Sequence, residues 1–385
     1  MCVAAIGVAV AASRHASVSG VSPVDPRGDW RLAWIVAVVS ALVCCGVGIW
    51  LALVGVLQLR AALLVAAVVQ ALPLLAPLLL SRDVDVYWAD ARVVTVHHAS
   101  PYLVTPSRFP SDPATRVASV EWRTKPEPYG PAWVAVGTLP AFVAGSSRKV
   151  AEFGYRLVAV AGVLAAVLLL ALFTRSAAAV ALLGWNPLVA LHYAGGGHSD
   201  ALMTLFLLAA VLYGLRASGG VSWAVASMFK AVPLVFLPLE LARSRLRRPL
   251  RFWVGLVGAA VVLTAVAFVA FGSQWVKGSL EGVHGTSPIG GVHFLAETGL
   301  RHRYAVVIGA AVFAVVYVLL VRSAWRNGKA RLGFAAAAFC MCSSLLRPWY
   351  ALWPLALASA EQDGLSVAAA FALSAYVLIA DAIPT

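Results

Sequence analysis

The sequence predicts an all-α, polytopic membrane protein. The chain has 385 residues, of which 62% are hydrophobic and only 12% charged, and this apolar share exceeds that of an ordinary soluble domain. Apolar segments recur at about the 20 residues that a helix needs to cross a bilayer. They lack the alternating pattern of barrel strands, so helices must satisfy the backbone. We expect one integral membrane domain over residues 1–385, with about 11–13 transmembrane or broken helices.

Full-length spans are predicted at Ala33–Leu57, Ala61–Leu80, Val150–Phe173, Phe252–Phe271, Tyr304–Val321 and, more loosely, Val367–Ile383. Shorter apolar segments lie between them, at Ala177–Leu191, Ala201–Leu215, Val221–Ala231, Leu234–Leu241, Leu332–Leu346 and Ala351–Ala360. Several of these are too short to cross a membrane alone. We therefore expect some of them to pair as broken helices that face a protein-lined cavity.

Two further apolar stretches do not fit the series of spans. Residues 1–32 begin with about half a span and lack the charged start of a signal peptide, so we interpret them as a poorly defined, truncated first helix. A full span at Ala132–Ser146 would reverse the orientation of everything after it. We interpret this stretch as a helix at the outer interface, anchored by Trp133 and by Arg148 and Lys149.

The net charge of +13 comes from Lys and Arg in short tracts between apolar segments, chiefly Arg243–Arg251 and Arg322–Arg331. This is the pattern of cytoplasmic loops in a membrane protein and argues against a nucleic-acid partner. The orientation makes residues 81–149 a large first extracytoplasmic loop with its interfacial helix. Residues 272–303 form the second such loop, and the active site is expected on this face of the cytoplasmic membrane.

The stretch LLLSRDVDVYWADAR, Leu78–Arg92, ends an apolar run with three acids. Asp83 lies about one helical turn beyond the predicted span, where partial burial would raise its pKa toward that of a useful general base. The simpler interpretation is that the charges only stop the helix at the interface. Asp83, Tyr87 and Asp90 share a helical face, which a simple stop does not need.

Two other residues of this stretch are assigned more weakly. Arg92 joins that polar face only if the helix has ended before it, and it is then a candidate substrate-binding residue. Asp85 points elsewhere and ranks lower.

The stretch GGGHSD, Gly195–Asp200, is a second candidate. The glycines let the backbone approach a ligand closely, and His198 and Asp200 stand at the start of a helix. Capping by Ser199 or Asp200 is the alternative. Capping explains neither His198 nor the three glycines.

Two cations complete the candidate site. Lys230 interrupts an apolar stretch, and an intramembrane cation is a functional candidate by default. Arg347 precedes the aromatic residues Trp349 and Tyr350, which an interfacial aromatic belt would also explain. If Lys230 and Arg347 are neighbours, they form a two-cation phosphate site. Tyr350 is a further candidate for substrate binding.

No metal or cofactor is expected. His97 and His98 are adjacent but lack a suitably spaced acid or cysteine, and the five cysteines all lie in apolar stretches. The chain has no glycine-rich phosphate loop of the soluble kind.

In order, the segments SRDVDVYWADAR, SPYLVTP, PEPYGP, GGGHSDALM, KAVP and RPWYALW resemble the GT-C superfamily of membrane glycosyltransferases. The likeness is greatest to the polyprenol-phosphate-mannose-dependent α-1,6-mannosyltransferases of actinobacterial lipomannan assembly, and it runs from about Leu78 to Leu355. Asp85 stands where the family usually has an aromatic residue, and Ser199 replaces an Asn. Both departures leave substrate identity open.

The resemblance implies a GT-C-like bundle that transfers a hexose, most often mannose, from a polyprenyl-phosphate donor to a cell-envelope glycan or glycolipid by inverting single displacement. It implies Asp83 as the general base, Lys230 and Arg347 on the donor phosphate, and His198 and Asp200 on hydroxyl groups. Tyr87, Asp90, Arg92 and Tyr350 would complete the pocket. Two rivals remain, a lipid-linked sugar transporter (flippase) and an inactive scaffold. The sequence leaves the oligomeric state open.

Overall fold

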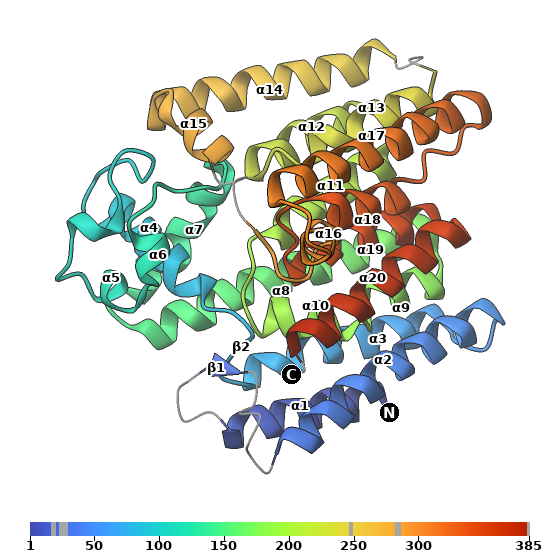
Figure 1. Cartoon of the computed structure of the whole chain (residues 1–385), viewed down its shortest axis with the longest axis horizontal. Helices are drawn as coiled ribbons and strands as arrows, with labels where there is room; N and C mark the ends of the chain where they lie inside the picture. The colour runs from blue at the N-terminus through green and yellow to red at the C-terminus, as the bar shows by residue number, and fades with distance from the viewer. Residues whose placement is uncertain (17–20, 23–29, 246–248, 282–285, 383–385) are drawn as a thin grey trace.

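The computed structural model describes residues 1–16, 21–22, 30–245, 249–281 and 286–382. The fold is all-α as predicted (Figure 1). Within the described residues, strand structure is limited to a short parallel pairing between β1 (Val21–Ser22) and β2 (Leu78–Leu79). Part of the predicted basic loop, Arg247 and Arg248, lies outside the described residues, as does Ile383 at the end of the last predicted span.

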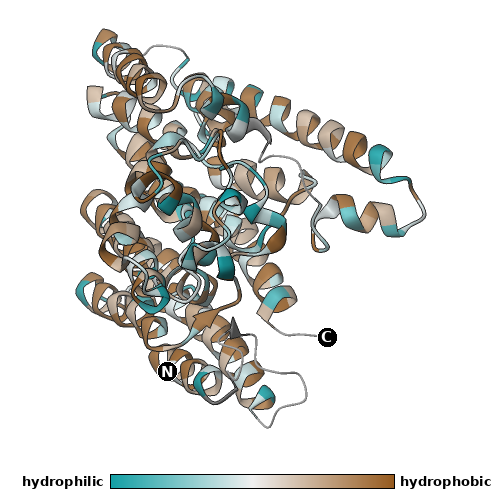
Figure 2. Ribbon diagram, turned by 90° about the vertical axis from the view of Figure 1, so that its left-hand side faces the viewer, coloured by the Kyte–Doolittle hydropathy of each residue, from teal (hydrophilic) through white to brown (hydrophobic). Residues whose placement is uncertain are grey.

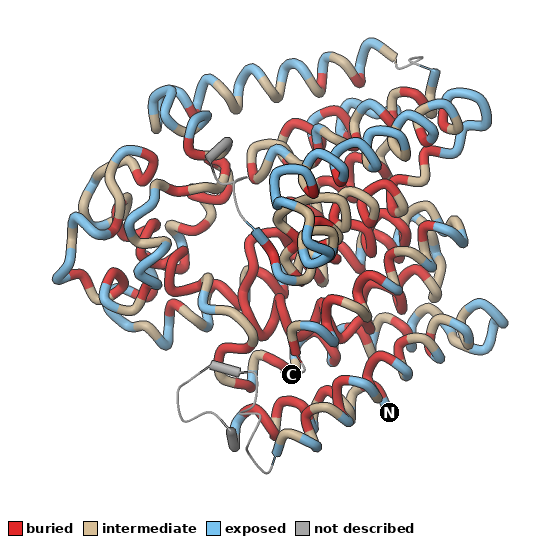
Figure 3. The backbone as a smooth tube through the Cα atoms, in the orientation of Figure 1, coloured by how far each residue is buried: buried red, intermediate tan, exposed pale blue. Residues whose placement is uncertain are grey.

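Five helices in the described part of the chain are long and apolar enough to cross a membrane. They are α2 (Arg31–Leu53), α8 (Arg148–Thr174), α14 (Leu250–Phe271), α17 (His302–Asn327) and α20 (Gly364–Ala382). Each corresponds to a predicted span, although α2 ends four residues before the predicted end at Leu57. Figure 2 shows that the helices of the bundle are mostly hydrophobic. Large apolar side chains of α14 and α17 are exposed (Figure 3), as expected where lipid covers a helix. The prediction of a polytopic membrane protein is therefore confirmed.

The predicted span Ala61–Leu80 is wrong in its length. Helix α3 covers only Leu59–Ala71, and it continues as a single 3₁₀ turn, η1 (Leu72–Leu75), before the chain becomes extended in β2. Pro73 and Pro77 end the helix because proline lacks a backbone N–H and its ring clashes with the preceding turn. The break brings the chain to Ser81 through an extended segment.

Residues 81–149 form a compact unit to one side of the bundle, at the left of Figure 1. Its elements are α4 (Asp83–Thr95), η2 (Pro106–Arg108), α5 (Pro113–Val117), α6 (Val120–Arg123) and α7 (Pro131–Ala144). Helix α8 continues directly from this unit into the bundle. The unit is therefore held against the bundle by a long helix that belongs to both.

Helix α7 lies where an interfacial helix was predicted, but one of its three predicted anchors, Trp133, is wrong. It exposes Leu139, Phe142 and Val143, which gives it an outward apolar face. Trp133 is only 3% exposed and packs in the interior, because it contacts the rings of Tyr87 and Tyr155. The apolar face, and not this tryptophan, is the part of α7 that is available to a membrane surface.

The predicted segment Ala177–Leu191 is a broken helix. Helix α9 (Ala177–Gly184) is bent by 43° from the segment that follows, α10 (Pro187–Val189) and the π-helical turn η3 (Ala190–Ala194). Asn186 starts the second part by accepting a hydrogen bond from the backbone N–H of Leu188. A broken helix is therefore present, but the break lies within one predicted segment, and pairing between two of the short segments stays a prediction.

The remaining helices surround this broken helix and bury the core (Figure 3). They are α1 (Cys2–Ala16), α11 (Asp200–Tyr213), α12 (Ala217–Phe229), α13 (Pro233–Arg243), α18 (Leu332–Cys342), η4 (Pro348–Ala351) and α19 (Leu352–Glu361). The second predicted loop contains α15 (Gln274–Glu281) and α16 (Gly291–Glu297).

Candidate active site

Asp83 opens helix α4 and faces the bundle. Its backbone N–H donates a hydrogen bond to Ser81 Oγ over 3.1 Å, and its Oδ2 lies 3.4 Å from Nδ1 of His198. The Asp83 side chain is 26% exposed, whereas the His198 side chain is fully buried. The carboxylate therefore has access to a substrate on one side and to an imidazole on the other.

The expectation that burial raises the pKa of Asp83 is wrong. Burial is the largest influence and does raise the pKa, but the contact with His198, the Ser81 hydroxyl and the positive charge of Arg347 outweigh it. The pKa of Asp83 is therefore lowered from its ordinary value of 3.8. The carboxylate is ionised at neutral pH, which leaves it ready to accept a proton.

The packing of the chain itself requires the three glycines. Gly197 has a φ of +74°, and a Cβ at this position would lie 2.6 Å from Val84 on helix α4. A side chain at Gly195 would meet the Leu191 carbonyl and Leu79. Because glycine tolerates both the positive φ and the close approach, the turn before His198 packs directly against the start of α4. This packing brings His198 to Asp83.

Arg156 joins the same two segments from α8. Its buried guanidinium donates hydrogen bonds to the carbonyls of Ala194 and Ala76, over 2.6 and 3.0 Å, and also to Pro73. Pro73 and Ala76 belong to the segment before Asp83, and Ala194 precedes the glycines. One arginine thus satisfies backbone acceptors on both sides of the site.

Lys230 and Asp200 form an ion pair with each other. Lys230 Nζ lies 3.1 Å from Asp200 Oδ1, which also accepts a hydrogen bond from Trp353 Nε1 over 3.0 Å. The same Nζ lies over the rings of Tyr350, Trp353 and Tyr129, at 4.2, 5.2 and 5.5 Å from their centroids. Ser199, at the N-cap of α11, makes no side-chain capping bond. The predicted capping alternative therefore fails, and both charged residues lie at the site already partnered.

Arg347 is the cation that this pairing leaves available. Its charge acts on Asp83 and on Tyr350, which places it at the same site. Across the described ranges no carboxylate lies within ion-pair distance of Arg347, and its guanidinium packs 6.0 Å from the Trp349 ring. A partly buried, unpaired guanidinium is well suited to bind an anion.

Tyr87 lies behind the wall of a small pocket. Its hydroxyl is 3.3 Å from that of Tyr129, and its ring makes edge contacts with Tyr129 and Trp133. The pocket itself is lined by Tyr129, Trp133, Ser199, Asp200, Met203, Phe229 and Lys230. Tyr87 therefore supports the lining residues and is not one of them.

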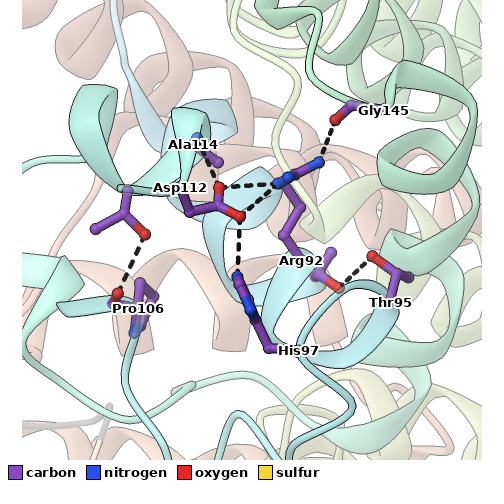
Figure 4. Close-up of polar contacts among 9 residues, drawn as sticks. Arg92, Thr95, His97, Pro106, Asp112, Ala114 and Gly145 are labelled. Carbon is purple, nitrogen blue, oxygen red and sulfur yellow. Dashed lines mark hydrogen bonds and ion pairs between the residues drawn. The ribbon is translucent and has the colours of Figure 1, made fainter. Parts of the chain in front are cut away.

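Arg92 is not brought to the site, in contrast to the sequence prediction. Helix α4 continues beyond Arg92 to Thr95. Nε of Arg92 donates hydrogen bonds to both carboxylate oxygens of Asp112, over 2.8 and 3.0 Å (Figure 4). Arg92 also donates to the carbonyl of Gly145, while His97 contacts the same Asp112 carboxylate at 2.9 Å. Arg92 therefore holds the unit of residues 81–149 together, because α4 is too long for this side chain to turn back toward Asp83.

Asp90 is also separate from Asp83. It is 3% exposed, and its neighbour Glu127 is 2% exposed. Burial raises the pKa of Asp90, and the charge of Glu127 raises it further. Burial likewise raises the pKa of Glu127 to about 8. This acid pair lies inside the unit, so the shared helical face inferred from the sequence does not make one pocket.

The contacts of Asp85 account for an acid at a position where an aromatic residue was expected. Asp85 is 1% exposed, and its two oxygens accept hydrogen bonds from Nε and Nη2 of Arg148, both over 2.9 Å. Arg82 adds a third contact at 3.1 Å. Asp85 and Arg148 therefore join the starts of α4 and α8, and this acid has no part in the pocket.

Sequence reasoning missed several groups beside Asp83. His192 is fully buried in η3 and lies 3.4 Å from Asp381, in the last turn of α20, while Trp349 stacks on His198 at 3.8 Å. His192 lies three residues before the first of the three glycines, and Asp381 is an acid near the end of an apolar span, so both positions are visible in the sequence. Neither signal predicts which side chains these two residues contact in the folded chain. Among the described residues, no group of three or more His, Cys, Asp or Glu side chains is arranged to hold a metal ion.

The fold and site define a polytopic membrane protein with a carboxylate–imidazole pair and an unpaired cation at the ends of its helices. Comparison with protein families identifies the family to which the chain belongs. Residues 1–243 match the family described as "Alpha-(1->6)-mannopyranosyltransferase, N-terminal domain", and the chain belongs to this family.

Three named relatives are similar over half or more of the chain. Alpha-(1->6)-mannopyranosyltransferase A of Mycobacterium tuberculosis is 28% identical over 79% of this chain. The B enzyme of Corynebacterium glutamicum is 27% identical over 72%, and a probable alpha-(1->6)-mannopyranosyltransferase of Mycolicibacterium smegmatis is 29% identical over 52%. The matches span 67%, 55% and 38% of the relatives' own lengths. No solved structure matches the chain.

Proposed function

We propose that the chain is a mannosyltransferase that moves mannose from a polyprenyl-phosphate donor to a hydroxyl group of a cell-envelope glycan or glycolipid. The observation that carries this proposal is the ionised Asp83 beside the buried His198, with the unpaired Arg347 acting on the same carboxylate. Membership of the mannopyranosyltransferase family supports the sugar and the reaction class.

Asp83 acts as the general base. It takes the proton of the acceptor hydroxyl as that oxygen attacks the anomeric carbon and forms the new glycosidic bond. The bond between the anomeric carbon and the phosphate oxygen breaks, and the lipid phosphate leaves with the electron pair. A single displacement of this kind converts a β-linked donor into an α-linked product. The lowered pKa keeps Asp83 in the required ionised form at neutral pH.

Arg347 binds the donor phosphate and stabilises the charge that develops on it. Lys230 has a smaller role there than the sequence suggested, because Asp200 already neutralises it. The ion pair instead fixes the aromatic wall formed by Tyr350, Trp353 and Tyr129. No metal or nucleotide is needed, since the phosphate bond of the donor supplies the driving force.

The donor reaches this site from the bilayer. Its polyprenyl tail lies among the long apolar helices, while its head group meets Asp83 at the helix ends. The arginine-rich connections between spans support an extracytoplasmic position for these helix ends, because such basic tracts favour the cytoplasmic side of the membrane. A site at the ends of membrane helices is within reach of a donor whose lipid tail lies in the bilayer.

The test is reconstitution of the purified protein in liposomes with polyprenyl-phosphate mannose, glucose or arabinose and a short mannoside acceptor. Formation of an α-linked mannosyl product, absent with Asp83→Asn, supports the proposal. A lipid-linked sugar transporter would move the donor across the bilayer without forming product. Movement without product, or equal product from the Asp83→Asn protein, overturns the proposal.

A further inference from the structure

In the part of the chain that the structure describes, six buried side-chain atoms that form no hydrogen bond lie together near Asp83. They are both ring nitrogens of His192 and of His198, Nε1 of Trp349 and Oδ2 of Asp381. Two of the ring nitrogens face a carboxylate oxygen at 3.4 Å, Nε2 of His192 toward Asp381 and Nδ1 of His198 toward Asp83, without forming a hydrogen bond. The side chains of both histidines are 0% exposed. An unpaired buried polar atom costs about 1–3 kcal/mol, so native proteins seldom gather several in one place. The cluster is built to receive a polar partner.

The four side chains form one continuous layer. The His192 ring lies 5.7 Å from the His198 ring and 6.0 Å from Trp349, which stacks on His198 at an angle of 15°. His192 Nε2 is 3.4 Å from Asp381 Oδ2. With the matching distance between His198 and Asp83, the layer runs from one carboxylate to the other.

Three separate elements meet to make this layer. His192 comes from the π-helical turn η3, Trp349 from η4, and Asp381 from the last turn of α20. Figure 1 places the C-terminal end of α20 near α10 and β2, at the end of the bundle where the chain enters α4. Asp381 is 30% exposed, so the layer opens to the outside at its far end.

The chemistry of the layer favours a neutral, polyhydroxylated ligand. A carboxylate oxygen accepts, an indole N–H donates, and a neutral imidazole does one of each. Neighbouring sugar hydroxyls both donate and accept, so they can satisfy all of these groups at once. A carboxylate at each end disfavours an anion.

The position of Arg347 indicates which sugar reaches the layer. Its charge acts on Asp83 and on Asp381, so a phosphate bound to Arg347 lies close to both ends of the layer. In the donor the hexose is bonded directly to that phosphate, whereas the acceptor is attached only at the moment of reaction. The donor hexose is therefore the group held within reach of these side chains.

We propose that His192, His198, Trp349 and Asp381 form a subsite that binds the hydroxyl groups of the donor hexose. This inference rests on the proposed function. It assigns His192, Trp349 and Asp381 to sugar recognition, and it explains why these buried polar groups form no hydrogen bonds within the described part of the chain.

The test compares the binding of two lipids, polyprenyl-phosphate mannose and the sugarless polyprenyl phosphate, to the detergent-solubilised full chain. The variants are His192→Gln and Asp381→Asn. Their controls are His293→Gln, whose histidine pairs with Glu297 at the surface, and Asp363→Asn, whose acid pairs with Arg331. We expect each subsite variant to bind the mannosyl lipid about 10-fold more weakly, the value of one charged hydrogen bond, with unchanged binding of polyprenyl phosphate.

The outcomes separate the two proposals. If the wild type and the subsite variants bind the mannosyl lipid equally well, the subsite proposal alone is overturned. The polar atoms of the cluster then bind water and not the sugar. Equal weakening for both lipids also overturns the subsite proposal, because the variants then damage the fold or the phosphate site. A wild-type protein that does not prefer the mannosyl lipid overturns the subsite, and if it also transfers no mannose, the proposed function fails with it.

Discussion

Oδ2 of Asp83 lies 3.4 Å from Nδ1 of His198, although 115 residues separate them in the chain. The contact sets the electrostatics of the carboxylate, because it opposes the effect of burial on the pKa of Asp83. It also joins the unit of residues 81–149 to the turn that follows the broken helix of the bundle. The first two predictions concern this pair.

Asp83→Asn should reduce mannosyl transfer by at least ~10²-fold, the lower range for loss of a general base. The amide is nearly the same size and keeps the fold, but it cannot accept the proton of the acceptor. Product formation in liposomes measures the effect, with thermal unfolding as the check on folding. The matched control is Asp363→Asn, far from the site. Undiminished transfer by Asp83→Asn rules out the proposed base.

His198→Ala should move the acid limb of the pH–rate profile to higher pH. The wild-type pKa of Asp83 lies below 3.8, so its protonation does not limit activity near neutral pH. Without the imidazole, burial acts less opposed and raises the pKa of the carboxyl. Activity should then fall at a higher pH as the medium is acidified. Profiles of kcat/KM for both proteins decide this, and coincident acid limbs contradict it.

Arg347→Gln should raise the KM for the lipid donor by about 10- to 100-fold, because a hydrogen bond to a charged group is worth roughly 1.5–3 kcal/mol. The KM for the acceptor should change little. Arg322→Gln, in the predicted cytoplasmic tract, serves as the control for loss of one arginine. Equal effects on donor and acceptor would remove the phosphate role from Arg347.

Lys230→Met should act mainly on stability. It leaves the buried carboxylate of Asp200 without its cation, and breaking a buried pair in this way costs about 3–5 kcal/mol. The double variant Lys230→Met with Asp200→Asn should recover part of the loss, because no uncompensated charge remains. Thermal unfolding of the three variants measures the coupling. Additive losses in the double variant argue against an energetically coupled pair.

Glu127→Gln should stabilise the protein at pH 8 and not at pH 4. The folded-state pKa of Glu127 is about 8, against an ordinary value of 4.5. As the pH rises between these values, the unfolded chain releases a proton that the folded chain retains, so the stability of the wild type falls. Removing the acid should raise the unfolding temperature by about 2–4 °C at pH 8.

The control for this comparison is Glu121→Gln, whose side chain is 66% exposed and pairs only with Lys125 at the surface. It should show no comparable dependence on pH. A difference between Glu127→Gln and wild type that is the same at pH 4 and pH 8 would show that the effect does not come from ionisation.

The long spans were predictable because apolar length alone determines them. The segment Ala61–Leu80 shows the limit of hydropathy as a guide to helix length. Its residues stay apolar up to Leu80, but the prolines end the helix earlier. Asp83, His198 and Lys230 could be predicted as site residues, because polar or charged side chains beside or within apolar segments are costly unless they have a role. Their contact partners could not be predicted, because a pair such as Lys230 and Asp200 depends on how the helices pack.

The misplaced residues have the same cause. Helical spacing groups Asp90 with Asp83 on α4, but the helix is buried on all sides and its faces contact different neighbours. Arg92 was assigned to the pocket from proximity in sequence, and Asp112 holds it elsewhere. Spacing predicts which side chains share a direction, and only the packing of other elements decides what lies there.

Arg156 limits how substrates can enter. Because one guanidinium holds the segment before Asp83 and the segment before His198, these two walls must move as a rigid body. The cleft cannot widen by separating its base from its imidazole. If the proposed function holds, the lipid head group enters and the product leaves at the other rim, where η4 and the end of α20 meet.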